Sequence, residues 1–382
     1  MMGTRFLPTP AKALACLCAV LIGTSASLGE ELTEATDNSS ASAPEAVPDV
    51  QEDTEKAKPK KKRNLIVVPV PFSNPTLDTG LLVGAAYFFP QTQEQEKAQP
   101  ASVIAAGGFY TTNDSFAYAI AQQSYWHEDR WRFTGALGHA DLDLELGAPG
   151  GPTIDWLIDG NFLYAALFRK ITGKWYAGVF TRYLDVDQEF EIILGTIDFD
   201  RGANIKSIGL GVEIEFDSKD NPYNSYTGRF FQINAQFNEE FFSGTTTYQS
   251  YSANFRAYHS LSPTLVLAWE VAGCARSSKT PLWDACRIGL RGFSATTYLG
   301  ESSALAQAEL RWRFHGKWGA VAFAGAGSVR NSFSQANDRD LIPSYGLGLR
   351  FMVLDSQRIN LRLDYARSKD SDAVYLSVGE AF

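Results

Sequence analysis

Residues 287–314 read RIGLRGFSATTYLGESSALAQAELRWRF. In the second half of this stretch, Leu310, Trp312 and Phe314 fall on one parity, whereas Glu309 and further polar residues fall on the other. Successive side chains of a β-strand point to opposite faces of the sheet, so this alternation predicts a strand with an apolar face and a charged face. An Arg-Gly-Phe tripeptide precedes this strand. The stretch indicates an all-β protein, either a soluble sandwich or a membrane barrel.

The chain from residue 64 onward divides into sixteen short alternating segments that are separated by turn residues. Most of them are 9–14 residues long, which suits tilted strands that need about 9–11 residues each to cross a membrane. The segments are 64–72, 79–90, 101–111, 115–126, 131–141, 158–171, 175–186, 204–217, 226–238, 246–260, 264–274, 304–315, 317–329, 343–354, 358–367 and 373–382.

The connections between these segments alternate in length. The tight ones are 127–130, 172–174, 261–263, 316 and 355–357, and the long ones are 142–157, 187–203, 275–303 and 330–342. Short periplasmic turns and long extracellular loops are typical of outer-membrane barrels. A soluble sandwich would explain the alternation of side chains, but not the loop lengths together with a charged content of only 20%. We therefore predict a 16-stranded antiparallel transmembrane β-barrel in the outer membrane of a Gram-negative-type bacterium.

The N-terminal part of the sequence reads as an export signal and a tether. Residues 1–26 have the pattern of a secretory signal peptide, because Arg5 and Lys12 precede the apolar run 13–22 and small residues follow. Residues 27–63 contain no aromatic residue and end in a basic run, which predicts a disordered periplasmic linker. The basic run would either attract acidic lipid head groups or remain a solvated tether. The barrel is expected over the rest of the chain, residues 64–382.

Few residues suggest chemistry. Beyond the signal peptide only Cys274 and Cys286 remain, and in an oxidising compartment we expect them to form a disulfide. The sequence has no CxxC, HExxH or Cys/His cluster, and its four histidines are scattered, so neither a metal nor a cofactor is expected. No serine or cysteine motif accompanies a base, which makes an outer-membrane enzyme the least favoured class. A net charge of −9 gives no indication of nucleic-acid binding.

Four stretches together resemble the BamA/TamA-type bacterial surface-antigen superfamily of outer-membrane barrels. Leu290 stands where that family usually has Val before its Arg-Gly-Phe, and the chain ends in Phe382, which is similar to the family's C-terminal barrel signal. The stretches are VEIEFDSKDNPYNSYTGRFFQINAQF (212–237), LRGF (290–293), AELRW (308–312) and the C-terminal segment 345–382.

The resemblance implies a fold and a set of partners. It implies sixteen strands whose first and last members meet, an extracellular loop between strands 11 and 12 that folds inward, and contact with outer-membrane lipids and, during biogenesis, with the barrel-assembly machinery. Two departures matter. Gly325 stands where the family usually has Asp, and residues 27–63 leave no room for the periplasmic POTRA domains.

The Arg-Gly-Phe loop is the candidate functional site. Because the apolar side of the strand that follows must face lipid, Glu309 is expected to face the lumen, the space inside the barrel. We expect Arg291 to reach Glu309, with Glu270 on the adjoining strand in reserve, while Gly292 lets the backbone approach the wall and Phe293 packs beside it. The alternative is a loop in which Arg291 is solvated. Further lumenal strand charges are expected at Arg311, Arg313, Arg350, Arg362 and Asp364.

The seam between the first and last strands is expected to be the weakest pairing in the wall. The first segment contains Pro69 and Pro71, which cannot donate hydrogen bonds to a ladder. The resemblance associates a loose seam with lateral opening, and the alternative is a first strand that merely frays. The favoured function is assistance of insertion or translocation of a protein or lipid client that the motifs do not specify. A passive porin-like channel is the alternative.

Overall fold

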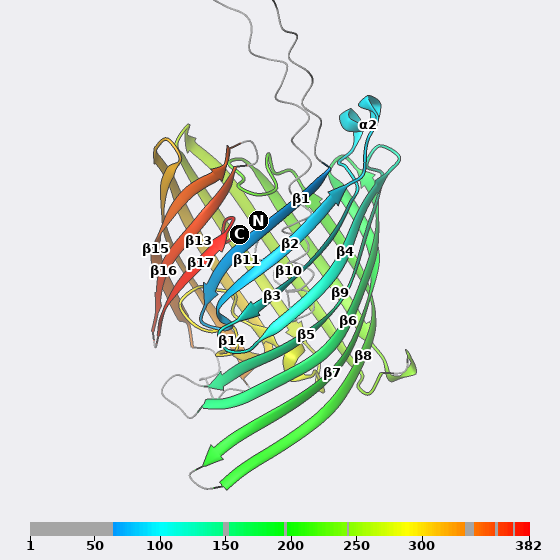
Figure 1. Cartoon of the computed structure of the whole chain (residues 1–382), viewed down its shortest axis with the longest axis vertical. Coiled ribbons are helices and arrows are strands. Elements are labelled where there is room, and N and C mark those ends of the chain that lie inside the picture. The colour runs from blue at the N-terminus through cyan, green and yellow to red at the C-terminus, as the bar shows by residue number, and fades with distance from the viewer. Residues whose placement is uncertain are drawn as a thin grey trace, which may run out of the picture.

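Sixteen antiparallel strands close into a barrel, and a seventeenth strand of two residues lies in one loop (Figure 1). The computed structural model describes residues 64–147, 153–194, 197–242, 244–332, 340–355, 358–369 and 371–382, so the predicted signal peptide and linker lie outside the described residues. The strands of the wall are β1 (Leu65–Asn74), β2 (Asp78–Phe88), β3 (Val103–Thr111), β4 (Phe116–Trp126), β5 (Trp131–Gly147), β6 (Thr153–Thr172), β7 (Trp175–Leu194), β8 (Ile197–Asp217), β9 (Gly228–Asn238), β10 (Tyr248–Ser262), β11 (Leu265–Arg276), β13 (Leu299–His315), β14 (Trp318–Ser332), β15 (Ile342–Leu354), β16 (Ile359–Ser368) and β17 (Asp372–Val378). The predicted 16-stranded antiparallel barrel is confirmed.

The remaining elements lie in the connections between strands. The short strand β12 (Cys286–Arg287) pairs with β13, and the 3-10 helices are η2 (Glu240–Phe242) and η3 (Leu282–Asp284). Helix α2 (Gln93–Ala98) begins with a capping box, in which Thr92 and Gln95 satisfy each other's main-chain N–H groups. None of the helices in the described ranges is long and apolar enough to cross a bilayer.

Every wall strand is antiparallel to its neighbours, so the connections between consecutive strands alternate between the two rims of the barrel. We call the rim at the top of Figure 1, where α2 lies and where the barrel chain begins and ends, the terminal rim. The opposite rim is called the loop rim, and it carries the connection 277–298 between β11 and β13.

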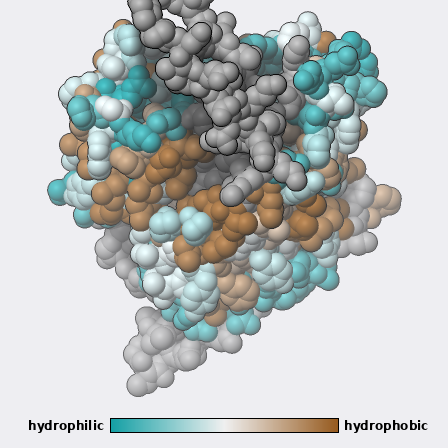
Figure 2. Space-filling model, turned by 45° about the horizontal axis from the view of Figure 1, so that its top comes forward, coloured by the Kyte–Doolittle hydropathy of each residue, from teal (hydrophilic) through white to brown (hydrophobic). Residues whose placement is uncertain are grey.

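The outer surface carries an apolar belt between the rims. Along β13, Leu310, Trp312 and Phe314 are 41–53% exposed, whereas Glu309 is 1% exposed, so the predicted parity of this strand is confirmed. Figure 2 shows the hydrophobic belt between hydrophilic surfaces at both ends. Aromatic pairs such as Trp318–Phe351 lie at its edge toward the terminal rim, as in the aromatic girdles of membrane barrels.

Two predicted loops are strands in the structure. The segments 142–157 and 187–203 were expected to be long loops, but β5 continues to Gly147, and β7 and β8 continue to within two residues of each other. The acidic residues in these segments alternate with apolar ones such as Leu142 and Leu144, which are 6% exposed and face inward, so the strand pattern continues. The β7–β8 hairpin therefore projects from the loop rim (Figure 1).

The last strand is shorter than predicted. The segment 373–382 was expected to be a strand up to its final residue, but β17 ends at Val378. Gly379 adopts a φ of 95°, and the residues after it turn into the lumen, where Phe382 is 3% exposed. Its ring belongs to an apolar cluster with Tyr258 and Ala268 of β10 and β11. The tail 379–382 therefore leaves the wall and occupies the lumen.

Candidate functional site

The connection 277–298 folds into the lumen. Its first half contributes Trp283, 2% exposed, to an apolar cluster with the inward side chains of β2 to β7. Its second half contributes Ile288 and Phe293 to a different cluster, which includes Leu305 of β13 and Val329 of β14. The loop therefore packs against two separate parts of the wall, and we call it the plug loop.

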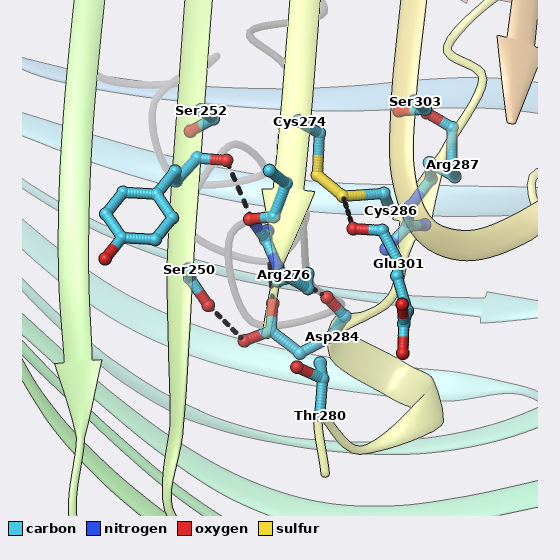
Figure 3. The surroundings of a disulfide bond; sticks show 12 residues. Ser250, Ser252, Cys274, Arg276, Thr280, Asp284, Cys286, Arg287, Glu301 and Ser303 are labelled. Atoms are coloured by element: carbon cyan, nitrogen blue, oxygen red, sulfur yellow. Dashed lines mark hydrogen bonds and ion pairs between the residues drawn. A yellow bond between two sulfur atoms is a disulfide. The ribbon is translucent and has the colours of Figure 1, made fainter. Parts of the chain in front are cut away.

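The predicted disulfide between Cys274 and Cys286 is confirmed. The two Cα atoms are 5.7 Å apart, and the bond ties the end of β11 to β12 at the base of the plug loop (Figure 3). The Cys286 Sγ also lies 3.4 Å from the main-chain oxygen of Glu301 on β13. The plug loop is thus covalently held at the point where it enters the lumen.

Asp284 anchors the plug loop beside the disulfide. Its side chain is fully buried and accepts hydrogen bonds from Arg182 Nη2 at 2.5 Å and from the Tyr248 hydroxyl at 2.8 Å. Arg276 Nε donates to the main-chain oxygen of Asp284 at 2.8 Å (Figure 3). Burial raises the pKa of Asp284, but the two guanidinium groups together outweigh it and hold this pKa below its ordinary value. Sequence reasoning missed this anchor, because a single Asp between Trp283 and Ala285 carries no recognisable motif.

Arg291 lies against the opposite part of the wall. Its Nη1 donates to Asp364 Oδ2 of β16 at 2.7 Å, and its Nη2 donates to Glu309 Oε1 of β13. The guanidinium lies 3.4 Å from the centre of the Phe323 ring on β14. The structure therefore brings Arg291 and Glu309 together as the sequence led us to expect, and it adds Asp364 as the second acid.

The two residues after Arg291 follow the wall closely. Gly292 has a φ of 111°, which favours glycine, and a Cβ atom there would lie only 3.1 Å from the Ser368 nitrogen, so the backbone approaches the wall closely. Its N–H donates to the Tyr375 hydroxyl of β17 at 2.8 Å, and its carbonyl accepts from Ser371 Oγ at 2.7 Å. Phe293 packs edge-on against Tyr298 with ring centres 5.0 Å apart. The tripeptide thus lies against the last hairpin of the barrel.

A buried charge network extends from Arg291 to the tail. Asp364 also accepts from Arg350, and Arg350 Nε donates to Glu380 at 2.8 Å. Every carboxylate oxygen of Glu309, Asp364 and Glu380 accepts at least one hydrogen bond. In contrast, five guanidinium nitrogens of the network's arginines have no hydrogen-bond acceptor among the described residues. The network is therefore rich in donors and poor in acceptors. Its members are Arg291, Glu309, Arg311, Arg350, Arg362, Asp364 and Glu380.

Two sequence expectations need correction, and the structure also shows what surrounds Gly325. Glu270 is no reserve partner of Arg291, because it lies 2.8 Å from Arg256 and also accepts from neighbouring amides on its own part of the wall. Arg313 lies at the terminal rim, where it donates to the Pro263 carbonyl at 3.0 Å, and it is outside the network. At Gly325 an added Cβ would lie 2.7 Å from Gln307 Cβ and 3.0 Å from Leu290 Cδ2. Gln307 of β13 and Leu290 of the plug loop thus occupy the space that an Asp at position 325 would need.

The seam between β1 and β17 is nearly unpaired. The two strands share one ladder position, Ser73 with Leu376, whereas all other neighbouring wall strands share seven or more. The Asn64 carbonyl accepts from Phe88 N–H, so even positions of β1 direct their main-chain groups to β2 and odd positions direct theirs to the seam. Pro69 and Pro71 are therefore on the seam side and offer no donor there.

The tail explains why the seam is short. An extended continuation of β17 would pass the first half of β1, but Glu380 turns inward, where its carboxylate accepts from Arg350 and from Asn360 Nδ2 at 2.6 Å. The main-chain oxygen of Phe382 accepts from Arg311 Nη2 at 2.7 Å. The terminal Phe382 therefore contacts charged and apolar groups of the lumen, and half of β1 is left with an open edge.

An apolar belt around a strand barrel, a loop packed into its lumen and a nearly open seam define an outer-membrane β-barrel. Residues 176–382, more than half of the 382, match the Omp85 superfamily domain. The chain belongs to the Omp85 superfamily, and the predicted resemblance to BamA/TamA-type barrels is confirmed. No curated protein matches the sequence.

Solved structures of the same fold include BamA and CdiB. The chain is similar to BamA from Haemophilus ducreyi lacking POTRA domains 1–3, with a TM-score of 0.60 and 12% identity over 84% of this chain and 71% of that one. It is similar to CdiB from Acinetobacter baumannii with a TM-score of 0.55 and 13% identity, over 83% and 60% of the two chains. It is similar to CdiB from Escherichia coli with a TM-score of 0.57 and 10% identity, over 84% of this chain and 63% of that one. At these identities the likeness concerns the fold.

Proposed function

We propose that this barrel assists the insertion or translocation of a protein or lipid client at the outer membrane, and that the wall opens at the β1–β17 seam. The observation that carries the proposal is the single ladder position of the seam. An unpaired strand edge is a template for another strand. The free half of β1 offers carbonyl acceptors to such a client strand, while Pro69 and Pro71 weaken its pairing with β17.

The family supports the general role. Omp85 barrels similar to BamA and CdiB serve outer-membrane protein insertion or secretion, and this chain has the same kind of barrel. A passive porin-like channel receives less support, because the plug loop packs into the lumen near one rim and the tail 379–382 occupies it near the other. Arg291 and its two acids would hold the plug loop in place during opening.

Export and orientation follow from the same proposal. Residues 1–26 would direct export and be removed, and residues 27–63 would remain as a linker on the periplasmic side. The terminal rim would then face the periplasm and the loop rim the cell exterior. The barrel-assembly machinery would insert the chain, with the segment that ends in Phe382 as its signal.

Locking the seam tests the proposal. Ser73→Cys with Leu376→Cys places two thiols at the one ladder position of the seam, whereas Ser73→Cys with Thr79→Cys ties the same residue to β2, where the ladder is complete. Both variants are oxidised and reconstituted in vesicles with an unfolded eight-stranded outer-membrane barrel as the client. Folding of the client is followed by its heat-modifiable migration on gels.

We expect the β1–β2 control to accelerate client folding as the native protein does, and the locked seam to reduce the rate to that of protein-free vesicles. Equal acceleration by both crosslinked variants would exclude the seam as the opening. If the native protein does not accelerate client folding or the flipping of a fluorescent lipid in the same vesicles, the proposed function is wrong. Steady conductance of the native barrel in planar bilayers would instead favour the passive channel.

A further inference from the structure

A basic cleft lies on the outer surface at the terminal rim, where the β4–β5 and β6–β7 turns meet. The Lys170 N–H donates to the Arg130 carbonyl at 2.8 Å and joins the two strand ends. The cleft has a volume of about 550 Å³, which is large enough for a lipid head group. Its lining includes His127, Arg130, Trp131, Arg169, Lys170 and Ile171.

Arg169 occupies the lipid-facing row of β6. Leu163 and Leu167 precede it on the same parity at 42% and 40% exposure, and Ile171 follows at 62%. Trp131 lies directly opposite on β5, and the Arg169 guanidinium is 5.4 Å from the centre of its ring. A charge in this row would be costly in hydrocarbon but is favourable at the interface, where tryptophan and arginine meet head groups.

The cations of the cleft have few acidic partners. Within the described ranges, Arg169 and Lys170 form no ion pair with a carboxylate. Arg130 lies 3.9 Å from Glu128, and both side chains are more than 70% exposed, so this pair is weak. Lys170 has the opposite parity to Arg169, and its Nζ lies 5.9 Å from the centre of the buried Tyr176 ring. The cleft therefore presents Arg130 and Arg169 as its unneutralised or weakly neutralised cations, beside His127 and next to the apolar belt.

The same strands carry the opposite charge at the loop rim. Asp141, Asp159 and Asp187 face one another in register across β5, β6 and β7 on the outer surface. Like charges directly opposite are mutually destabilising and would repel an anionic head group. This part of the wall thus attracts anions at one membrane surface and repels them at the other.

We propose that the basic cleft binds the phosphate of an acidic glycerophospholipid in the leaflet at the terminal rim. The planar guanidinium groups of Arg130 and Arg169 can bind phosphate oxygens in bidentate fashion. Trp131 and Ile171 lie where the glycerol and the first acyl carbons would follow. The position of Arg169 within an apolar row favours a lipid over a free anion, because a free anion would gain nothing from that neighbourhood.

Native mass spectrometry of the purified full barrel in detergent tests the site. The probes are phosphatidylglycerol, phosphatidylcholine with the same acyl chains, lipid A and inorganic phosphate. The variants are Arg130→Gln, Arg169→Gln and their combination, and Arg330→Gln is the matched control, because Arg330 is an exposed arginine near the loop rim. Heat-modifiable migration on gels shows that each variant is folded.

We expect retained phosphatidylglycerol to exceed phosphatidylcholine and to fall about tenfold or more in the double variant, since each basic residue near an acidic lipid surface contributes measurably to binding. The Arg330→Gln control should retain it as the native protein does. Equal retention of both phospholipids, or an unchanged double variant, would overturn the proposal. Preferential retention of lipid A, or displacement of phosphatidylglycerol by millimolar inorganic phosphate, would also overturn it, because the ligand would then be a different lipid or a free anion.

Discussion

Replacing Asp364 should destabilise the barrel more than replacing Arg291, although the two side chains form one ion pair. Asp364 is fully buried and is approached by three arginines, with Arg291 at 2.7 Å and Arg362 at 3.6 Å. All carboxylate oxygens of the network are already bonded, and the arginines retain nitrogens without an acceptor. Loss of an acceptor is therefore harder to compensate than loss of a donor.

The magnitudes follow from what each substitution leaves behind. In Asp364→Asn, three buried guanidinium groups lose a shared negative charge, and we expect a cost of about 3–5 kcal/mol, as for a broken buried ion pair. In Arg291→Met, Glu309 keeps Arg311 at 3.0 Å and Asp364 keeps Arg350, and the methionine stem still packs on a ring. We expect about 1–3 kcal/mol there. The double variant should cost less than the sum of the two, because it removes one donor and one acceptor together.

Urea unfolding of the barrel refolded in lipid vesicles measures these free energies, with tryptophan fluorescence and heat-modifiable migration as two signals. Asp355→Asn is the matched control, because Asp355 pairs with Lys317 at 3.2 Å with both side chains at least half exposed. It should change stability by about 0–1 kcal/mol. An Arg291→Met variant that is as unstable as Asp364→Asn, or strictly additive costs in the double variant, would refute the reasoning.

Three further predictions concern the plug loop and the tail. Replacing Cys274 and Cys286 by Ser should cost about 3 kcal/mol in the chain-entropy model and expose the loop to protease, and two alkylatable thiols in unreduced native protein would contradict the bond. Because the pKa of Asp284 is depressed in the folded protein, its ionised form stabilises the docked loop above about pH 4, and this stabilisation is lost as the pH falls through the lower folded pKa. Cleavage by pepsin within 277–298 should therefore rise below about pH 4. Cleavage that is independent of pH would contradict this role of Asp284. Glu380→Gln should loosen the tail, so that carboxypeptidase removes it faster than from native protein, and equal rates would show that this carboxylate does not hold it.

The sequence predicted the wall better than the lumen. Strict alternation around Glu309 gave both the strand and its inward face, because a period of two leaves only one register that buries the charge and exposes the apolar side chains. The same rule was not carried far enough at 142–157, which was predicted to be a loop although Leu142 and Leu144 continue the alternation, with acidic residues on the other face. Charge on one face of a strand is no sign of a loop once that face extends beyond the apolar belt.

Contacts across the lumen could not be predicted, because they join residues that are far apart in sequence and have no local pattern. Arg291 was expected to reach Glu309, because Glu309 lies on the strand that follows the loop in sequence. Asp364 lies 73 positions from Arg291, and its place opposite Arg291 depends on the curvature of the barrel. The partner of Glu270 was missed for the same reason, since Arg256 adjoins it only through the β10–β11 register.

The seam and the plug loop are physically connected through the charge network. Glu380 bends the tail out of the wall by binding Arg350, and Arg350 shares Asp364 with Arg291 of the plug loop. An extended tail would have to remove Glu380 from Arg350, which would leave Arg350 dependent on Asp364 alone and draw that acid away from Arg291. Full pairing of β17 with β1 would therefore weaken the docking of the plug loop, because it removes Glu380 from the charge network that also holds Arg291. A barrel built in this way keeps its seam short while its lumen is occupied, because the residue that would complete the seam is the one that neutralises the network.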